Sequence, residues 1–67
     1  MYEFELVEGS GFDSVWKVIS YGMEIGEITL QGPAVSIKET EYGFADAEEI
    51  PSIEYWFFRD VIENLRR

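Results

Sequence analysis

The first forty residues alternate between apolar and polar side chains, with the period of two that is typical of β-strands. At the start of the chain, Tyr2, Phe4 and Leu6 alternate with Glu3 and Glu5. Successive side chains of a strand point to opposite faces, so this pattern predicts a sheet with one buried face. We expect four strands, at about residues 2–8, 15–21, 23–31 and 34–40.

Turn residues separate these stretches, and one stretch changes phase. Tyr21-Gly22 predicts a hairpin turn between the second and third strands. In the third strand the apolar parity changes between Ile25 and Ile28, and Gly26 lies at the change. A β-bulge inserts one extra residue and re-aims the side chains beyond it. We therefore predict a bulge at Gly26.

In the fourth strand, Val35 and Ile37 are expected to face inward. From Pro51 the period becomes helical, over about residues 52–66. Pro51 suits the first turn of a helix, and Ser52 is a plausible N-cap. One broad apolar arc is expected to pack on the sheet: Phe57, Val61, Leu65, Phe58, Ile62 and Tyr55. The pattern predicts an α+β fold, a three- to four-stranded antiparallel β-meander packed against one C-terminal α-helix.

Composition supports one compact domain over residues 1–67. Apolar residues make up 46% of the chain and aromatic residues 16%, which favours a folded core over a disordered acidic tail. The N-terminus lacks the basic and apolar regions of a signal peptide, and no apolar run approaches the ~20 residues of a membrane span. We expect a cytoplasmic protein.

The residue types argue against catalysis. The chain has no cysteine and no histidine, which removes zinc sites of the His–Cys kind and the usual nucleophile–base pairs. Gly9-Ser10-Gly11 is not continued by the Gly-Lys of a phosphate-binding loop, and no carboxylate run has calcium-loop spacing. A hydrolase with two carboxylates would need a substrate cleft that a small core can hardly provide. We predict a protein that is not an enzyme and has no metal or cofactor.

The charge is strongly unbalanced, with fourteen acidic residues against five basic ones and a net charge of −9. This charge disfavours nucleic acid and anionic lipid as direct partners and favours a basic protein surface. The plainer interpretation is that the charge only keeps a small protein soluble. Between residues 39 and 54 six carboxylates occur without a Lys or Arg: Glu39, Glu41, Asp46, Glu48, Glu49 and Glu54.

Trp56 falls outside the expected apolar arc of the helix, and Asp60 and Glu63 follow it at i+4 and i+7. One interpretation is an interface anchor flanked by carboxylates, because Trp is enriched at binding hot spots. The other is that the segment 42–50 folds over Trp56. The candidate partner-binding residues are Glu39, Glu41, Asp46, Glu48, Glu49, Ile53, Trp56, Asp60 and Glu63.

No stretch of the chain carries a family motif. In size, charge and lack of catalytic groups it is similar to small acidic inhibitors, such as phage-encoded anti-defence and anti-CRISPR proteins and other mimics of nucleic acid; this is an analogy of class. The first hypothesis is thus a non-enzymatic inhibitor that blocks a basic site on a nucleic-acid-handling protein. The alternative is a small homodimeric structural or assembly module that uses a strand edge or the Trp56 face.

Overall fold

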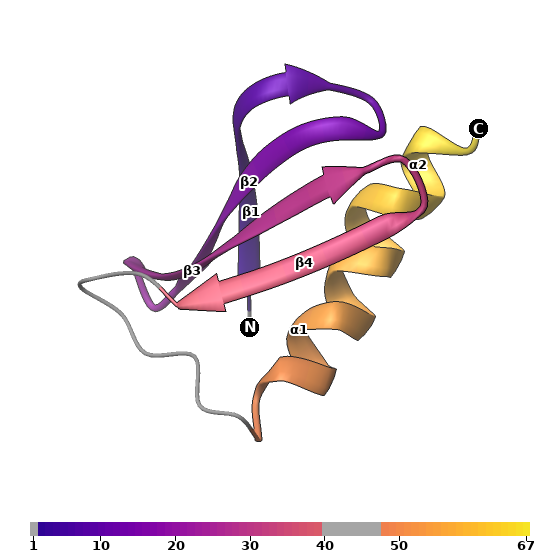
Figure 1. Ribbon diagram of the computed structural model, residues 1–67. Coiled ribbons are helices and arrows are strands. Elements are labelled where there is room, and N and C mark those ends of the chain that lie inside the picture. Colours follow the sequence, from indigo (N-terminus) through magenta and orange to yellow (C-terminus); the bar gives the residue numbers. More distant parts are fainter. Residues whose placement is uncertain (1, 40–47) are drawn as a thin grey trace.

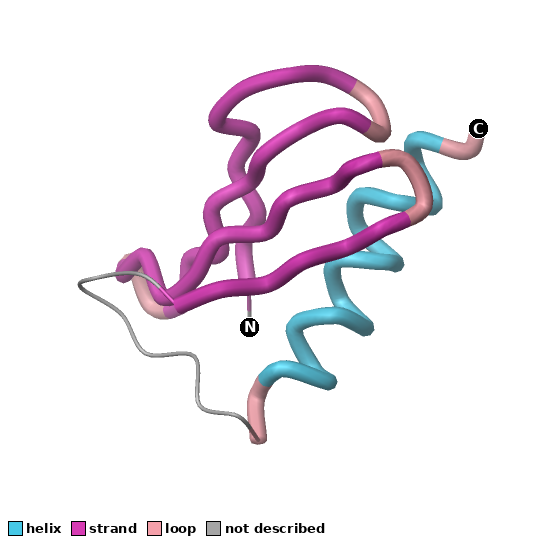
Figure 2. Tube along the Cα trace, viewed as in Figure 1, coloured by secondary structure: helices cyan, strands magenta, loops and turns pink. Residues whose placement is uncertain are grey.

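The computed structural model describes residues 2–39 and 48–67. Four antiparallel strands form one sheet in the order β1-β2-β3-β4, and a C-terminal helix covers one of its faces (Figure 1, Figure 2). The predicted α+β meander with a C-terminal helix is therefore confirmed. The strands are β1 (Tyr2–Ser10), β2 (Asp13–Ser20), β3 (Met23–Gln31) and β4 (Ala34–Glu39).

Tight turns connect the strands. The predicted turn at Tyr21-Gly22 is confirmed, with φ values of 52° and 78°. Two positive φ values in succession give a type I′ turn, whose twist matches that of the flanking strands. The turns at the opposite end of the sheet are tied together, because the Gly32 amide donates a hydrogen bond to the Phe12 carbonyl at 2.9 Å.

The predicted bulge in β3 is confirmed. Val18 pairs with Gly26 whereas the next residue, Ile19, pairs with Glu24. Ile25 is therefore the extra residue, and the parity of the apolar side chains changes across it.

A second bulge, in β1, was not predicted. Leu6 pairs with Trp16 and Glu8 pairs with Val15, so Val7 is the extra residue. Tyr2 and Phe4 pack against the core as expected, but Leu6 is 48% exposed. Leu6 pairs with Trp16, so it points to the same face as Tyr2 and Phe4 as predicted, but it is not covered by the core.

The C-terminal segment is one continuous helix made of α1 (Ile50–Phe57), a π-helical stretch η1 (Phe58–Ile62) and α2 (Glu63–Leu65). Pro51 lies in the first turn, as predicted. The N-cap is Glu49, so the expectation of Ser52 at that position was wrong. The helix begins at Ile50, before Ser52. Pro51 favours this start, because its fixed φ suits a helix and the first turn needs no N–H group from it.

The π-helical stretch explains which side chains of the helix are buried. The Glu63 amide bonds to the Phe58 carbonyl, five residues back. Ile53, Phe57 and Val61 recur every four residues and are all buried. In a regular α-helix such a row drifts by about 40° per step, whereas the wider π turn reduces the drift.

The expected apolar arc was partly wrong. Phe57, Val61 and Ile62 are buried as expected, and Leu65 packs at the edge of the core. Tyr55 and Phe58, however, are 54% and 41% exposed. The buried row starting at Ile53 turns Tyr55 away from the sheet and leaves Phe58 at the margin of the core, beside Val35 of β4.

The core lies between the helix and the inner face of the sheet. Phe57 is at its centre, in edge-on contact with Phe4 (ring centroids 5.1 Å apart) and Trp16 (5.9 Å). At its margin, Val35 of β4 faces inward as expected, because it pairs with the buried Leu30 and lines a hollow with Ile62, although 48% of it remains exposed. Ile37 packs against the core. The buried core residues are Val18, Ile28, Leu30, Ile53, Phe57, Val61 and Ile62.

Candidate functional site

The exposed side chains of the helix form rows. Residues four positions apart lie on the same side of this helix, so the rows next to the buried row Ile53, Phe57 and Val61 are aligned in the same way. Trp56, Asp60 and Asn64 line hollows shared with β1. On the side away from the strands, a shallow hollow is lined by helix residues alone, among them Tyr55, Arg59 and Glu63. Glu54 and Phe58 approach Val35 of β4. The rows therefore present different chemistry on different sides.

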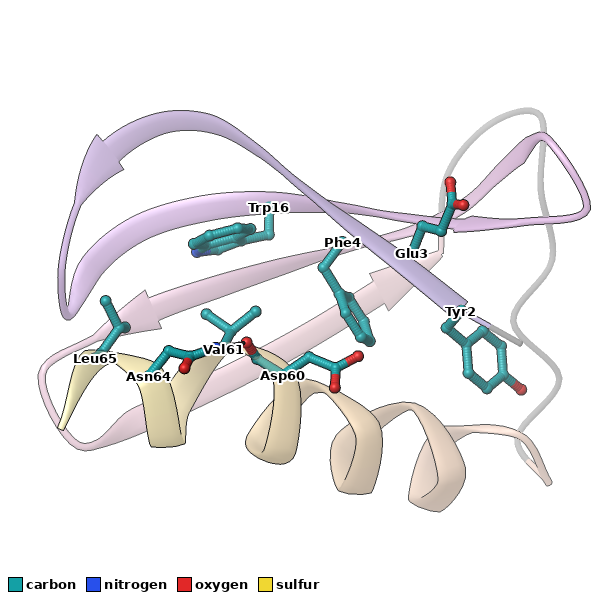
Figure 3. A pocket seen from close by; sticks show the side chains of 8 residues that line it. All are labelled: Tyr2, Glu3, Phe4, Trp16, Asp60, Val61, Asn64 and Leu65. Carbon is teal, nitrogen blue, oxygen red and sulfur yellow. Dashed lines mark hydrogen bonds between the residues drawn. The ribbon is translucent and has the colours of Figure 1, made fainter. Parts of the chain in front are cut away.

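Two adjoining hollows between the helix and β1 share Tyr2, and we call them together the β1 groove. Toward the C-terminal end of the helix its lining is Tyr2, Glu3, Phe4, Trp16, Asp60, Val61, Asn64 and Leu65 (Figure 3). Toward the N-terminal end its lining is Tyr2, Ser20, Tyr21, Glu49, Ser52 and Trp56. In the part of the chain that the structure describes, no Lys or Arg lines either hollow.

Aromatic rings dominate the sheet side of the β1 groove. Figure 3 shows Tyr2, Phe4 and Trp16 directed from the strands toward the helix. The indole of Trp16 is fixed in place, because its Nε1 donates to the Ser14 hydroxyl at 2.8 Å and that hydroxyl donates to the Gly11 carbonyl at 2.8 Å. Ser14 is itself buried. This part of the groove is therefore a preformed apolar wall.

The helix side of the β1 groove carries the carboxylates. Asp60 lies on the helix beneath Phe4 (Figure 3). Glu49, the N-cap of the helix, lines the same hollow as Tyr2. Glu3 borders the groove, but its carboxylate points away from the helix. Burial, together with the negative charge of Glu49 and the nearby Tyr21, raises the pKa of the Tyr2 phenol above its ordinary value of 10.0. The Glu49 carboxylate therefore lies close enough to Tyr2 to disfavour a negative charge on the phenol.

Trp56 lies between the β1 groove and the row formed by Tyr55, Arg59 and Glu63, which we call the outer row. Its side chain is 39% exposed. The Tyr55 ring meets it edge-on with centroids 5.3 Å apart, and the Arg59 guanidinium lies 5.8 Å from its centroid. Arg59 also donates to the Tyr55 hydroxyl at 3.2 Å. The indole is therefore supported from the outer side while its groove side remains open.

The structure brings together some of the predicted site residues. Trp56, Asp60 and Glu49 all line the β1 groove, and Glu48 is exposed next to it in sequence. Glu63 belongs to the outer row beside Arg59, so the predicted ridge of Trp56, Asp60 and Glu63 is divided between two sides of the helix.

The remaining predicted residues do not contribute a described surface. Ile53 is fully buried in the core, where no partner reaches it, because it begins the row that faces the sheet. Glu39 ends β4. Glu41 and Asp46 lie outside the described residues, as does most of the segment 42–50 that was considered as a cover for Trp56.

Sequence reasoning missed the strand side of the groove. Tyr2 and Phe4 were expected only as residues of one face of the first strand, and neither Trp16 nor Asn64 was considered. Alternation along β1 identifies the face on which Tyr2 and Phe4 lie, but it carries no information on which helix row lies opposite them.

The open face of the sheet has a balanced charge pattern. One row crosses all four strands in the register Glu5, Lys17, Glu27 and Lys38. Lys38 Nζ lies 3.4 Å from the Glu27 carboxylate. Because opposite charges alternate along it, this row contributes little to the net negative field, whereas Glu3 on the same face is paired with Ile19 and has no cation opposite it.

Comparison of the chain with protein-family models, with curated proteins and with solved structures finds no match. Over residues 2–39 and 48–67, no group of three or more carboxylates has the arrangement of a metal site. In the same residues, no helix combines the length and apolar character needed to cross a bilayer.

Proposed function

We propose that this protein is a non-enzymatic acidic binding protein that engages a basic site on a partner protein and blocks it. Nucleic-acid-handling proteins are the commonest carriers of such sites, because they hold phosphates with Lys and Arg. An inhibitor of the phage anti-defence or anti-CRISPR kind, acting as a nucleic-acid mimic, fits this proposal by analogy of size and charge.

One observation carries the proposal: a partly exposed Trp56 stands between Glu49 and Asp60 in a groove whose described lining includes no cation. Trp side chains are enriched among the anchors of protein interfaces, and flanking carboxylates steer a basic partner toward them. A charge that served solubility alone would need no such arrangement around an aromatic anchor.

The test begins with capture of partners from a host lysate by tagged protein, at low and then moderate salt. A captured partner is purified, and displacement of labelled DNA or RNA from it is measured with increasing amounts of this protein. We expect displacement, with an association rate that falls steeply as salt rises.

A charge reversal then tests the mechanism. Glu48→Lys with Glu49→Lys should slow association and flatten its salt dependence. The matched control is Glu8→Lys with Asp13→Lys, which changes the net charge equally at the far hairpin. If both double variants bind the partner as the parent does, the electrostatic proposal is wrong. Circular dichroism verifies that each variant is folded.

The homodimeric module is a second candidate, favoured by the exposed rings of Tyr55 and Phe58 on the helix. Pairing of two helices through these rings would bury apolar surface that the monomer leaves in water. Sedimentation at micromolar concentration distinguishes the two: a dimer that Tyr55→Ser with Phe58→Ser dissociates supports the module, and a monomer excludes it.

A further inference from the structure

We propose that the β1 groove binds an extended, Lys- or Arg-rich segment of the partner, and that this segment pairs with the free edge of β1 as a fifth strand. This inference rests on the proposed function, because it assigns a place and a geometry to the basic partner. The partner is expected to be recognised through its backbone hydrogen bonds as well as through its positive charge.

The edge of β1 supplies the backbone half of the site. β1 spans nine residues and is the terminal strand of the sheet, paired on one side with β2. Among the described elements nothing pairs with its other side. Such an edge presents a row of N–H and C=O groups that an extended peptide can satisfy.

The helix supplies the side-chain half. Tyr2 and Phe4 point from β1 toward the helix, so every second residue of an added strand would point the same way. Side chains at those positions would enter the β1 groove and meet Trp56 and Asp60 across it.

The groove has subsites of different chemistry. Near the helix start, a guanidinium or ammonium group would lie between the Glu49 carboxylate and the faces of Tyr2 and Trp56, which combines an ion pair with cation–π contact. Asp60 provides a second carboxylate about three helical turns beyond Glu49. Near Leu65, the wall of Trp16 favours an apolar side chain.

The charges of β1 itself select the occupant. Glu3 and Glu5 lie on the opposite face of the strand and are exposed. A second copy that paired through β1 would bring these carboxylates against their equivalents, which is destabilising. A basic segment would instead place cations beside them. Charge complementarity therefore favours a basic peptide over self-pairing at this edge.

The experiment titrates the isotope-labelled full chain with two blocked heptapeptides of equal charge and follows backbone amide shifts. The first peptide alternates Arg and Val; the second replaces each Val by Pro, which cannot take part in a strand ladder. We expect the first to shift β1 and the row Trp56, Asp60 and Asn64, and the second to bind at least about tenfold more weakly.

Paired variants locate the subsites. Asp60→Asn should weaken the alternating peptide about three- to tenfold, and its control Glu63→Gln on the outer row less than twofold. Trp56→Ala should weaken it about tenfold, against little change for Tyr55→Ala. Circular dichroism verifies folding of each variant.

Equal affinity for the two peptides, with shifts spread over the acidic surface, would overturn the edge-pairing inference and leave the proposed function standing. Binding of neither peptide, together with failure to retain any basic partner at low salt, would remove both. A dimer formed through β1, seen by sedimentation and by shifts in the free protein, would also overturn the inference, because a second copy would then be the occupant.

Discussion

At the scale of single residues, neighbours on the helix have opposite environments. Phe57 is fully buried and contacts Phe4 and Trp16, whereas Phe58 is 41% exposed beside Arg66, whose guanidinium lies 4.9 Å from its ring centroid. Because the two side chains are identical, comparing their replacement by Ala measures how much burial alone adds to the free energy of unfolding.

We expect Phe57→Ala to lower the free energy of unfolding by about 3–5 kcal/mol, since it removes a buried ring and leaves a cavity. A domain of this size has a total stability of only roughly 3–10 kcal/mol, so the variant should be largely unfolded. Phe58→Ala should cost about 1 kcal/mol or less. Urea unfolding followed by circular dichroism measures both; equal losses would contradict the assignment of Phe57 to the core.

The raised pKa of Tyr2 predicts a pH dependence at the alkaline end. The folded protein keeps the phenolic proton at pH values where the unfolded chain, with its pKa near 10.0, has released it. This contribution to stability is complete below pH 10 and is lost as the pH rises through the folded-state pKa.

Tyr2→Phe should therefore weaken the loss of stability above pH 10, and the phenolate absorbance of the parent should contain a late-titrating component that the variant lacks. Glu49→Gln should move that component to lower pH, because it removes a neighbouring negative charge. If Tyr2→Phe leaves the absorbance titration unchanged apart from its amplitude, Tyr2 is not in the environment described.

At the scale of elements, the π-helical stretch sets the orientation of the helix. The core-facing positions of the helix are Ile53, Phe57, Val61, Ile62 and Leu65. If residues 50–65 formed a regular α-helix, these five positions would spread over an arc of about 180°. Removing one residue between Phe57 and Val61 would bring the same positions into an arc of about 100° in a regular helix. The π turn thus accommodates one residue more than an ideal amphipathic helix requires.

We expect deletion of Arg59 to be tolerated, with the π turn converted to α-helix and cooperative unfolding retained. Deletion of both Arg59 and Asp60 is the control, because it would rotate Val61 and Leu65 off the sheet and unfold the protein. Thermal unfolding measures both. If the single deletion is as damaging as the double one, the π turn is required by contacts other than those of the buried row.

At the scale of the whole molecule, the charge is unevenly distributed. The open face of the sheet alternates Glu5, Lys17, Glu27 and Lys38 in register, whereas the β1 groove has carboxylates without a cation among its described lining residues. With a net charge of −9, the folded chain repels itself more than the expanded one does.

Stability should therefore rise with salt. Between 20 and 300 mM NaCl we expect a gain on the order of 1 kcal/mol, or roughly 4–8 °C in Tm, because the screening length becomes shorter than the separation of the exposed carboxylates. Glu8→Gln with Asp13→Asn should reduce this dependence. A Tm independent of salt in the parent would contradict the view that unbalanced charge destabilises the fold.

The sequence by itself determined the elements. Alternation with a period of two specified four strands and their inner face, Tyr21-Gly22 specified a turn that needs positive φ, and the phase change at Gly26 specified a bulge. These are local properties, fixed by side-chain direction and backbone sterics. The excess of carboxylates likewise follows from composition alone.

Only the tertiary structure decided which side of each element meets another. The pattern placed Tyr55 and Phe58 in the core and left Ile53 at the surface, because a wheel of 100° per residue assumes a regular helix. The π turn changes that angle, and packing against Phe4 and Trp16 selects the row that begins at Ile53.

The candidate site depended on the same packing. Glu49, Trp56 and Asp60 were identifiable from charge and residue type, but Tyr2 joins them only when β1 lies beside the helix. A groove between residues at opposite ends of the chain is a product of long-range contact, which no local periodicity encodes.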